Sequence, residues 1–159
     1  NRAAPMAINA NVVDALQQLW LNDIPSKVNI FGWRLLLAKL PTRMALVRKG
    51  IIVNPRESCC AFCFREAEDI DHLFFNCPFS NQVWTKIYKW LNVEFIPFDE
   101  SWKHFVTFGL LVTNKKYAKG RHVIWLATTW SLWRLRNHIM FRGDLANLSS
   151  LVDQITYIS

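Results

Sequence analysis

Four cysteines and a histidine lie close together between Cys59 and Cys77, and no cysteine occurs elsewhere in the chain. Four of these five residues have the spacing Cys60-x2-Cys63-x8-His72-x4-Cys77. A C-x2-C turn presents two thiolates to one metal ion, and a later histidine and cysteine complete a tetrahedron of the ligands that structural zinc prefers. Because protein atoms would fill all four positions, none is left for an activated water. The spacing therefore predicts one structural Zn²⁺ per chain, which fixes the fold and takes no part in chemistry.

Cys59 is predicted not to be a ligand. Adjacent side chains point in different directions, so Cys59 and Cys60 do not suit the same ion, and pairing Cys59 with Cys63 needs a less common x3 turn. If the register differed by one residue, the ligand set would be Cys59, Cys63, His72 and Cys77.

Three other interpretations of the cysteines are weaker. A disulfide pair is typical of secreted proteins, and a chain of 159 residues that is 52% apolar can build a core without one. Free cysteines can pack as small apolar side chains, but this does not explain why they cluster beside a histidine. A nucleophilic cysteine needs a base held near it by the fold, and nothing in the sequence selects one among His104, His122 and His138.

Basic residues are concentrated in two stretches on either side of the acidic cysteine segment. The formal net charge is +7, and residues 24–56 and 103–143 carry seven and eight basic residues without any Asp or Glu. Basic residues interleaved with aromatic ones can neutralise phosphates and stack bases. The residues expected to contact nucleic acid are Arg34, Lys39, Arg43, Arg48, Lys49, Arg134, Arg136 and Arg142. The alternative for the arginines is a solvated helix face, and most tryptophans, Trp33 and Trp125 among them, are expected to pack in the core.

Apolar periodicity and capping residues predict a mainly α fold with little or no β structure, organised around the Cys3His knuckle. The predicted helices are one that begins near Asn9 or Asn11 and presents Trp20 on its apolar face, then 27–40, 43–49, 78–91, 101–112, 122–141 and 148–158. The 27–40 helix is apolar on two faces and is expected to be central in the core. Residues 92–100 are expected to form a linker and 113–120 a solvated loop, and "GIIV" at 50–53 is the strand candidate.

We expect one zinc-binding helical domain over 1–159, with helices and the zinc knuckle at 16–91 and a C-terminal helical part at 101–159. The apolar runs are far too short for a membrane span, and no signal peptide pattern opens the chain. The chain begins at Asn1 rather than Met, so we expect a fragment whose upstream targeting signal, if it has one, lies outside it. The expected location is intracellular, nuclear or cytoplasmic.

Several motifs together resemble a known family. They are "LWLNDIPSKVNIFGWRLLLAKLPTRMALVRKGI", "CAFCFREAEDIDHLFFNC", "VWTKIYKWL" and "IWLATTWSLWRLRNHIMF". In these motifs the chain resembles, over residues 16–142, the reverse-transcriptase zinc-binding domain of plant LINE-type (non-LTR) retrotransposons. The resemblance implies Cys60, Cys63, His72 and Cys77 as zinc ligands, and a role in positioning template RNA or target DNA.

The expected function is that of a zinc-stabilised nucleic-acid-binding module without catalytic activity. The chain has no Tyr-x-Asp-Asp polymerase motif and no carboxylate cluster suited to magnesium. The alternative is a protein-interaction module that docks onto a reverse-transcriptase core or serves a host complex as a domesticated remnant. A cysteine enzyme is a third hypothesis, and no small-molecule substrate or membrane partner is expected. The nucleic-acid-binding and protein-interaction hypotheses differ in one expectation: only the first requires the basic residues to share one face.

Overall fold

The computed structural model describes residues 8–21, 23–97, 100–112 and 120–159. Its elements are α1 (Ala10–Trp20), α2 (Ser26–Leu36), α3 (Arg43–Arg48), η1 (Pro55–Ser58), η2 (His72–Asn76), α4 (Pro78–Leu91), α5 (Ser101–Leu111), α6 (Arg121–Arg142) and α7 (Leu148–Ile158). The predicted mainly helical class is confirmed, and the described residues form no strand. The strand candidate at 50–53 does not form a strand, and an isolated β-bridge joins Cys59 to Ala67. Residues 98–99 of the expected linker and 113–119 of the expected loop lie outside the described part.

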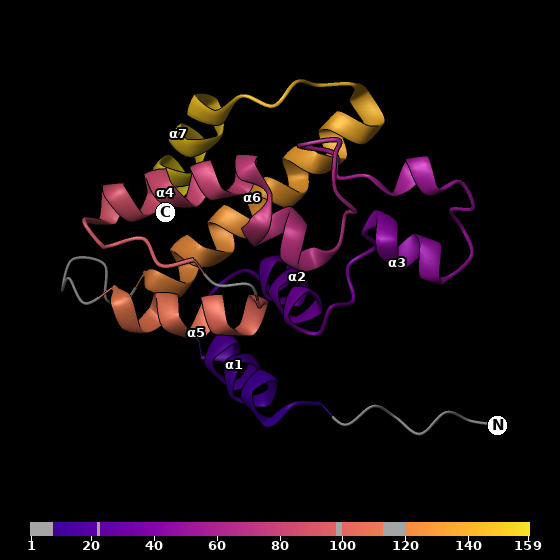
Figure 1. The fold of residues 1–159 in the computed structure, drawn as a ribbon. Coiled ribbons are helices and arrows are strands. Elements are labelled where there is room, and N and C mark those ends of the chain that lie inside the picture. Colours follow the sequence, from indigo (N-terminus) through magenta and orange to yellow (C-terminus); the bar gives the residue numbers. More distant parts are fainter. Residues whose placement is uncertain (1–7, 22, 98–99, 113–119) are drawn as a thin grey trace.

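The long helix α6 runs through the middle of the molecule (Figure 1). Helices α2, α5 and α7 pack against it, α4 packs against α7, and α1 packs against α2 and α5. Helix α3 and the short η1 lie together at one end, next to the segment that carries the cysteines (Figure 1). Although α6 has 22 residues, neither it nor any other described helix is apolar enough over such a length to cross a membrane.

Local sequence signals set several helix ends. The Asn9 side chain accepts a hydrogen bond from Asn11 N at 2.9 Å and caps α1, and Thr42 Oγ1 accepts one from Ala45 N at 3.3 Å and caps α3. Helix α6 ends at Gly143, whose φ of 70° lies in the left-handed region that glycine adopts without strain. These ends agree with the predicted starts and stops.

Helix α2 comes close to its neighbours because Gly32 has no side chain. A Cβ atom at this position would lie 2.6 Å from Leu126 Cδ2 on α6 and 3.2 Å from Leu19 Cδ1 on α1. Both distances are shorter than an ordinary van der Waals contact, so a larger residue would have to displace these two leucine side chains. The glycine therefore allows α2 to pack directly beside α6.

One of the two apolar faces of α2 is in the core, and the other is on the surface. Phe31 and Leu35 are buried, whereas Ile30 is 50% and Trp33 37% exposed. On α1, Trp20 is 53% exposed. The expectations that α2 is buried on both faces and that Trp20 and Trp33 pack in the core are therefore wrong. Apolar composition does not show which face of a helix meets a partner.

The core between α4, α5 and α6 is aromatic. Trp84 and Tyr88 on α4 and Trp125 on α6 are buried, as predicted for the α4 stripe and for Trp125. Trp125 Nε1 donates a hydrogen bond to His104 Nδ1 at 2.9 Å, and the His104 ring lies 4.6 Å from the ring of Phe75. Burial lowers the pKa of His104 to about 3, so this histidine is neutral at physiological pH.

Candidate metal centre

The first two thiols of the motif come from a tight loop between residues 60 and 66. Cys60 N donates to Glu66 O at 2.7 Å, and Phe64 N donates to Cys60 O at 2.9 Å. Phe64 has a φ of 56°, a conformation that costs a residue with a side chain roughly 1–2 kcal/mol. Phe62 N donates to Cys60 Sγ at 3.4 Å. The loop thus turns Cys60 and Cys63 toward one point.

The other two side chains are brought together by the π-helical turn η2. Cys77 N donates to His72 O at 2.7 Å, closing a hydrogen bond across five residues. His72 N donates to Asp69 Oδ1 at 2.7 Å, so an aspartate side chain anchors the start of the turn. Cys77 is followed by Pro78 at the first position of α4, where proline needs no hydrogen-bond partner. The x4 spacing between histidine and cysteine therefore matches one π-helical turn.

The ligand atoms of Cys60, Cys63, His72 and Cys77 all lie within 4.8 Å of one another. Cys60 Sγ is 3.9 Å from Cys77 Sγ, and Cys63 Sγ is 3.3 Å from His72 Nε2. A zinc tetrahedron with Zn–S near 2.3 Å and Zn–N near 2.0 Å requires S···S separations of about 3.8 Å and S···N separations of about 3.5 Å. Thiolates suit zinc rather than magnesium or calcium. The four residues are therefore positioned to bind zinc.

Two thiols of the cluster share a buried hydrogen bond. Cys60 and Cys77 are both fully buried. The S–H group of Cys60 donates to Cys77 Sγ, which lowers the pKa of Cys77 and raises that of Cys60. Zinc binds thiolates, so loading the site must release the proton that Cys60 retains. The affinity for the metal should accordingly fall as the pH is lowered.

The Glu66 carboxylate lies near the ring nitrogen of His72 that faces away from the cluster. His72 Nε2 faces Cys63, and His72 Nδ1 lies 3.7 Å from Glu66 Oε2. A carboxylate near the far nitrogen of a metal-binding histidine supports the orientation of its ring. Glu66 is largely exposed, with 75% of its side chain accessible, so this support is solvent-screened.

Cys59 lies outside the four-residue cluster. Its backbone pairs with Ala67 in the β-bridge, and the residue is half-buried. All four cysteines of the chain are free of disulfide bonds. The cluster thus uses the register that starts at Cys60.

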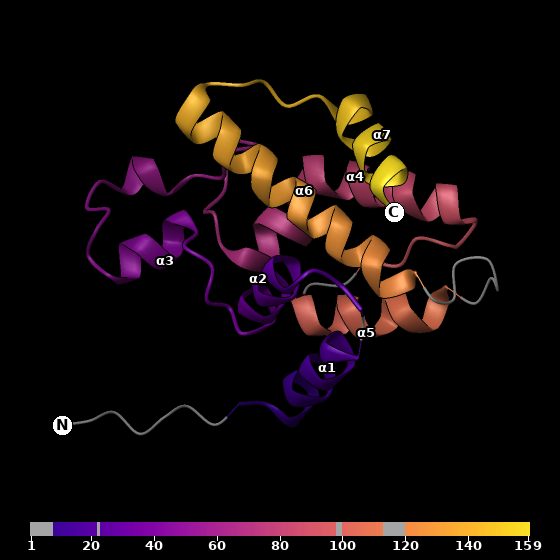
Figure 2. The same cartoon turned by 180° about the vertical axis from the view of Figure 1, so that it is seen from behind.

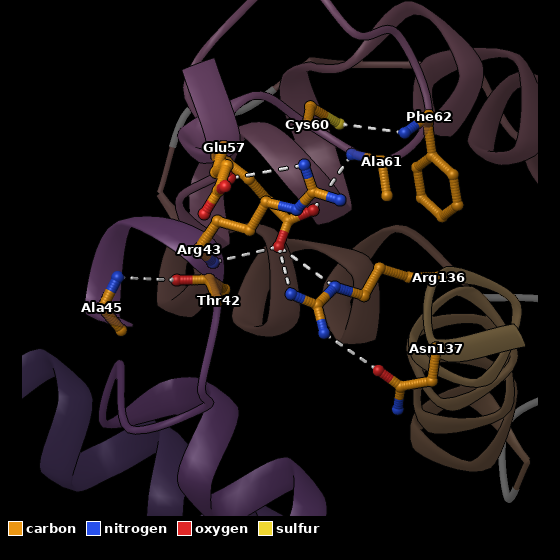
Figure 3. Close-up of polar contacts among 10 residues, drawn as sticks. Thr42, Arg43, Ala45, Glu57, Cys60, Ala61, Phe62, Arg136 and Asn137 are labelled. Atoms are coloured by element: carbon orange, nitrogen blue, oxygen red, sulfur yellow. Dashed lines mark hydrogen bonds and ion pairs between the residues drawn. The ribbon is translucent and has the colours of Figure 1, made fainter. Parts of the chain in front are cut away.

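A buried glutamate that the sequence analysis treated only as part of an acidic segment ties this loop to the helices. The Glu68 side chain is 0% exposed. Its Oε2 accepts from Ala61 N at 3.0 Å, and its Oε1 accepts from Arg43 N at 3.1 Å and from Arg136 Nη2 at 2.6 Å. Figure 3 shows Ala61, Arg43 and Arg136 converging from the cysteine loop, the start of α3 and α6. One carboxylate therefore joins three segments that are far apart in sequence.

Arg136 was predicted to contact nucleic acid, and the structure corrects this. Its side chain is 3% exposed and forms an ion pair with Glu68. Its guanidinium also lies over Trp133, with Arg136 Cζ 4.8 Å from the ring centroid. A buried charge must be paired, so Arg136 is held inside the molecule. Arg34, Lys39, Arg48, Lys49, Arg134 and Arg142 are exposed, and Arg43 is half-buried.

The comparisons with known proteins agree with this geometry. The sequence model of the family described as zinc-binding in reverse transcriptase matches residues 5–84, which is half of the chain and includes all four clustered residues. The match ends at Trp84, so it does not extend to residue 142 as the resemblance did. Searches of curated proteins and of solved structures gave no match. On the strength of the family match and the Cys3His cluster, the chain belongs to the family of zinc-binding domains of reverse transcriptases.

Proposed function

We propose that this chain is a non-catalytic module of a retrotransposon reverse transcriptase, of the plant LINE type, that binds RNA or DNA and positions it for the catalytic domain. One Zn²⁺ per chain, held by Cys60, Cys63, His72 and Cys77, stabilises the module. The donor set supports a structural role for the metal, because three thiolates and an imidazole complete a tetrahedron and leave no position for a reactive water.

The observation that carries the nucleic-acid role is the packing of α2 against α6. These helices belong to the two acid-free basic stretches, residues 24–56 and 103–143. Lys27 Nζ of α2 lies 5.5 Å from the ring centroid of Trp130 on α6. Residues that are a hundred positions apart thus form one surface in which positive charge is not offset by acidic side chains of either helix, and such a surface favours a polyanion.

Binding to short RNA and DNA at two salt concentrations tests this function. Phosphate contacts release counterions, so the logarithm of the affinity should fall with the logarithm of the salt concentration with a slope of about −0.7 for each contact on a single strand. Affinity that is undetectable at low salt, or that does not change with salt, would contradict the proposal.

A second function is supported by apolar side chains around α3 and the cysteine loop. Ile51, Val53 and Phe64 are 66%, 86% and 66% exposed. Exposed apolar groups in one region suit a protein partner, such as the reverse-transcriptase core or a host protein. Replacing Val53 and Phe64 with serine should leave nucleic-acid binding unchanged if they serve that separate role. A pull-down with the parent polymerase, with and without the two substitutions, decides whether they do.

A further inference from the structure

We propose that the exposed face of α2, together with the adjoining part of α6, is a binding site for single-stranded nucleic acid, with Trp33 as the stacking platform and Lys27 and Lys39 as phosphate contacts. The inference rests on the proposed function and assigns it to one surface and to one kind of nucleic acid. Helix α6 crosses between α2 and α7 when the molecule is seen from behind (Figure 2).

The packing of α2 on α6 builds this surface. Phe31 of α2 packs edge-on against Trp130 of α6, with ring centroids 5.1 Å apart, and Gly32 lets the two helices approach closely. This packing fixes Trp130 beneath Lys27. The two lysines lie near opposite ends of α2, and a helix rises about 1.5 Å per residue, so the surface between them is long enough for several nucleotides.

The charge of this surface also favours nucleic acid. Neither α2 nor α6 contains an acidic residue, and Lys27 and Lys39 take part in none of the ion pairs found among the described residues. Instead, Lys27 lies over Trp130 and Lys39 Nζ lies 5.8 Å from the ring centroid of Trp33. Two ammonium groups are therefore placed over aromatic rings and available to phosphates.

The tryptophans of this region differ in how accessible their rings are. Trp133 is closed to a base, because the Arg136 guanidinium lies on it and Phe74 stacks against it with centroids 6.1 Å apart. Trp33 is 37% exposed beside Ile30, which is 50% exposed, and the side chain over its ring is that of the exposed Lys39, which belongs to the same proposed site. A base can stack on an accessible tryptophan only if it is not already stacked between neighbouring bases. The bases inside a duplex are stacked in this way, whereas those of a single strand can be freed. The surface therefore favours a single strand over a duplex.

An acidic residue in the cleft between α6 and α7 limits the path of the strand. Arg134 and Asp144 line the same cleft between α6 and α7, and Asp144 Oδ2 lies 3.7 Å from His138 Nδ1. A carboxylate in that cleft repels phosphates, so the strand should follow α2 and not enter the cleft. Arg134 should accordingly contribute less than Lys27 or Lys39.

The test measures the affinity of zinc-loaded protein for a fluorescent 12-mer of oligo(U) and for a 12-base-pair duplex of mixed sequence, at two salt concentrations. Trp33→Ala should weaken single-strand binding by about 5- to 150-fold and leave duplex binding nearly unchanged, and Trp33→Phe should restore much of the loss. The double variant Lys27→Ala/Lys39→Ala should flatten the salt slope by about 1.4. Trp20→Ala and Lys86→Ala/Lys89→Ala, which alter exposed residues on α1 and α4, are the matched controls and should bind like the wild type.

The outcomes separate this inference from the proposed function. If the wild type binds neither probe at low salt, both fail. If the wild type binds but the α2 variants bind as well as the control variants, or lose single-strand and duplex affinity equally, the assignment to this surface is overturned and the general function stands. Zinc content and far-UV circular dichroism of each variant show that lost binding does not arise from lost folding.

Discussion

Replacing Arg136 with methionine removes the charge partner of a fully buried carboxylate, and it should strongly destabilise the protein. The Glu68 and Arg136 side chains are 0% and 3% exposed, and Arg136 Nη2 lies 2.6 Å from Glu68 Oε1. The other groups that donate to the carboxylate are the neutral backbone N–H groups of Arg43 and Ala61. Breaking a buried pair by removing one partner costs about 3–5 kcal/mol, because the remaining charge is left uncompensated. This is a large part of the roughly 5–15 kcal/mol by which a domain is stable.

The double variant Glu68→Gln/Arg136→Met distinguishes an ion pair from mere packing. Glu68→Gln alone leaves the Arg136 guanidinium buried without a counter-charge, so we expect a cost similar to that of Arg136→Met, about 3–5 kcal/mol. In the double variant no buried charge remains, and the cost falls to that of weakened hydrogen bonds with backbone N–H groups, about 1–3 kcal/mol. The two substitutions should therefore be non-additive by about 3 kcal/mol or more.

Urea unfolding of the zinc-loaded proteins, followed by tryptophan fluorescence, gives the four free energies of this cycle. Arg134→Met is the matched control, because Arg134 is exposed on the same helix and such surface substitutions usually stay within about 0.5 kcal/mol. The reasoning is refuted if Arg136→Met costs less than about 1 kcal/mol, or if the costs of the single substitutions add in the double variant.

Three further predictions concern the cysteine loop and the core. Cys59→Ser should keep full zinc occupancy and lower the free energy of unfolding by about 1 kcal/mol, whereas Cys60→Ser should lose zinc and local order. Metal analysis and thermal melts of the two variants test this. The reverse result would mean that Cys59, and not Cys60, is the ligand. Glu66→Gln should weaken zinc affinity by about 10-fold, which is near the lower limit for a group that supports a histidine ligand. The effect should be this small because the Glu66 carboxylate is exposed and lies 3.7 Å from His72 Nδ1. Competition with a chromophoric chelator measures the affinity, and an unchanged value would contradict the prediction. The pKa of His104 is about 3 in the folded protein and about 6.5 in the unfolded chain. Between these pH values the unfolded chain therefore binds more protons than the folded protein. The free energy of unfolding should accordingly fall as the pH falls, by at most about 1.4 kcal/mol per pH unit. His104→Phe should remove this part of the slope between pH 6.5 and 5, and a slope equal to that of the wild type would show that His104 does not carry it.

The parts of the molecule that sequence predicts well are those decided by neighbours in sequence. The capping of α3 by Thr42 and the end of α6 at Gly143 depend on residues within one helical turn. The convergence of Cys60 and Cys63 is likewise local, since a short loop holds both. Such features follow from backbone geometry and need no knowledge of the remaining fold.

The features that the sequence did not reveal depend on contacts between residues far apart in the chain. Glu68 stands in an acidic segment, and acids in such a segment are usually solvated, yet its partner Arg136 lies on α6, 68 residues away. The arginine was misassigned for the same reason, because charge alone does not separate a buried ion pair from a phosphate contact. Similarly, Trp33 resembles a core residue by its neighbours, but only the docking of α2 on α6 decides that its side of the helix faces outward.

X-ray absorption at the zinc edge tests the central claim most directly, because it reports which atoms hold the metal. The protein, purified under reducing conditions without chelator, should contain one zinc per chain. Its spectrum should show three sulfur neighbours at about 2.3 Å and one light-atom neighbour at about 2.0 Å, together with the outer-shell scattering of an imidazole ring. This corresponds to Cys60, Cys63, His72 and Cys77 as a closed structural site. A protein that takes up no zinc, a first shell with four sulfurs, or one with two or more light-atom neighbours would contradict this ligand set.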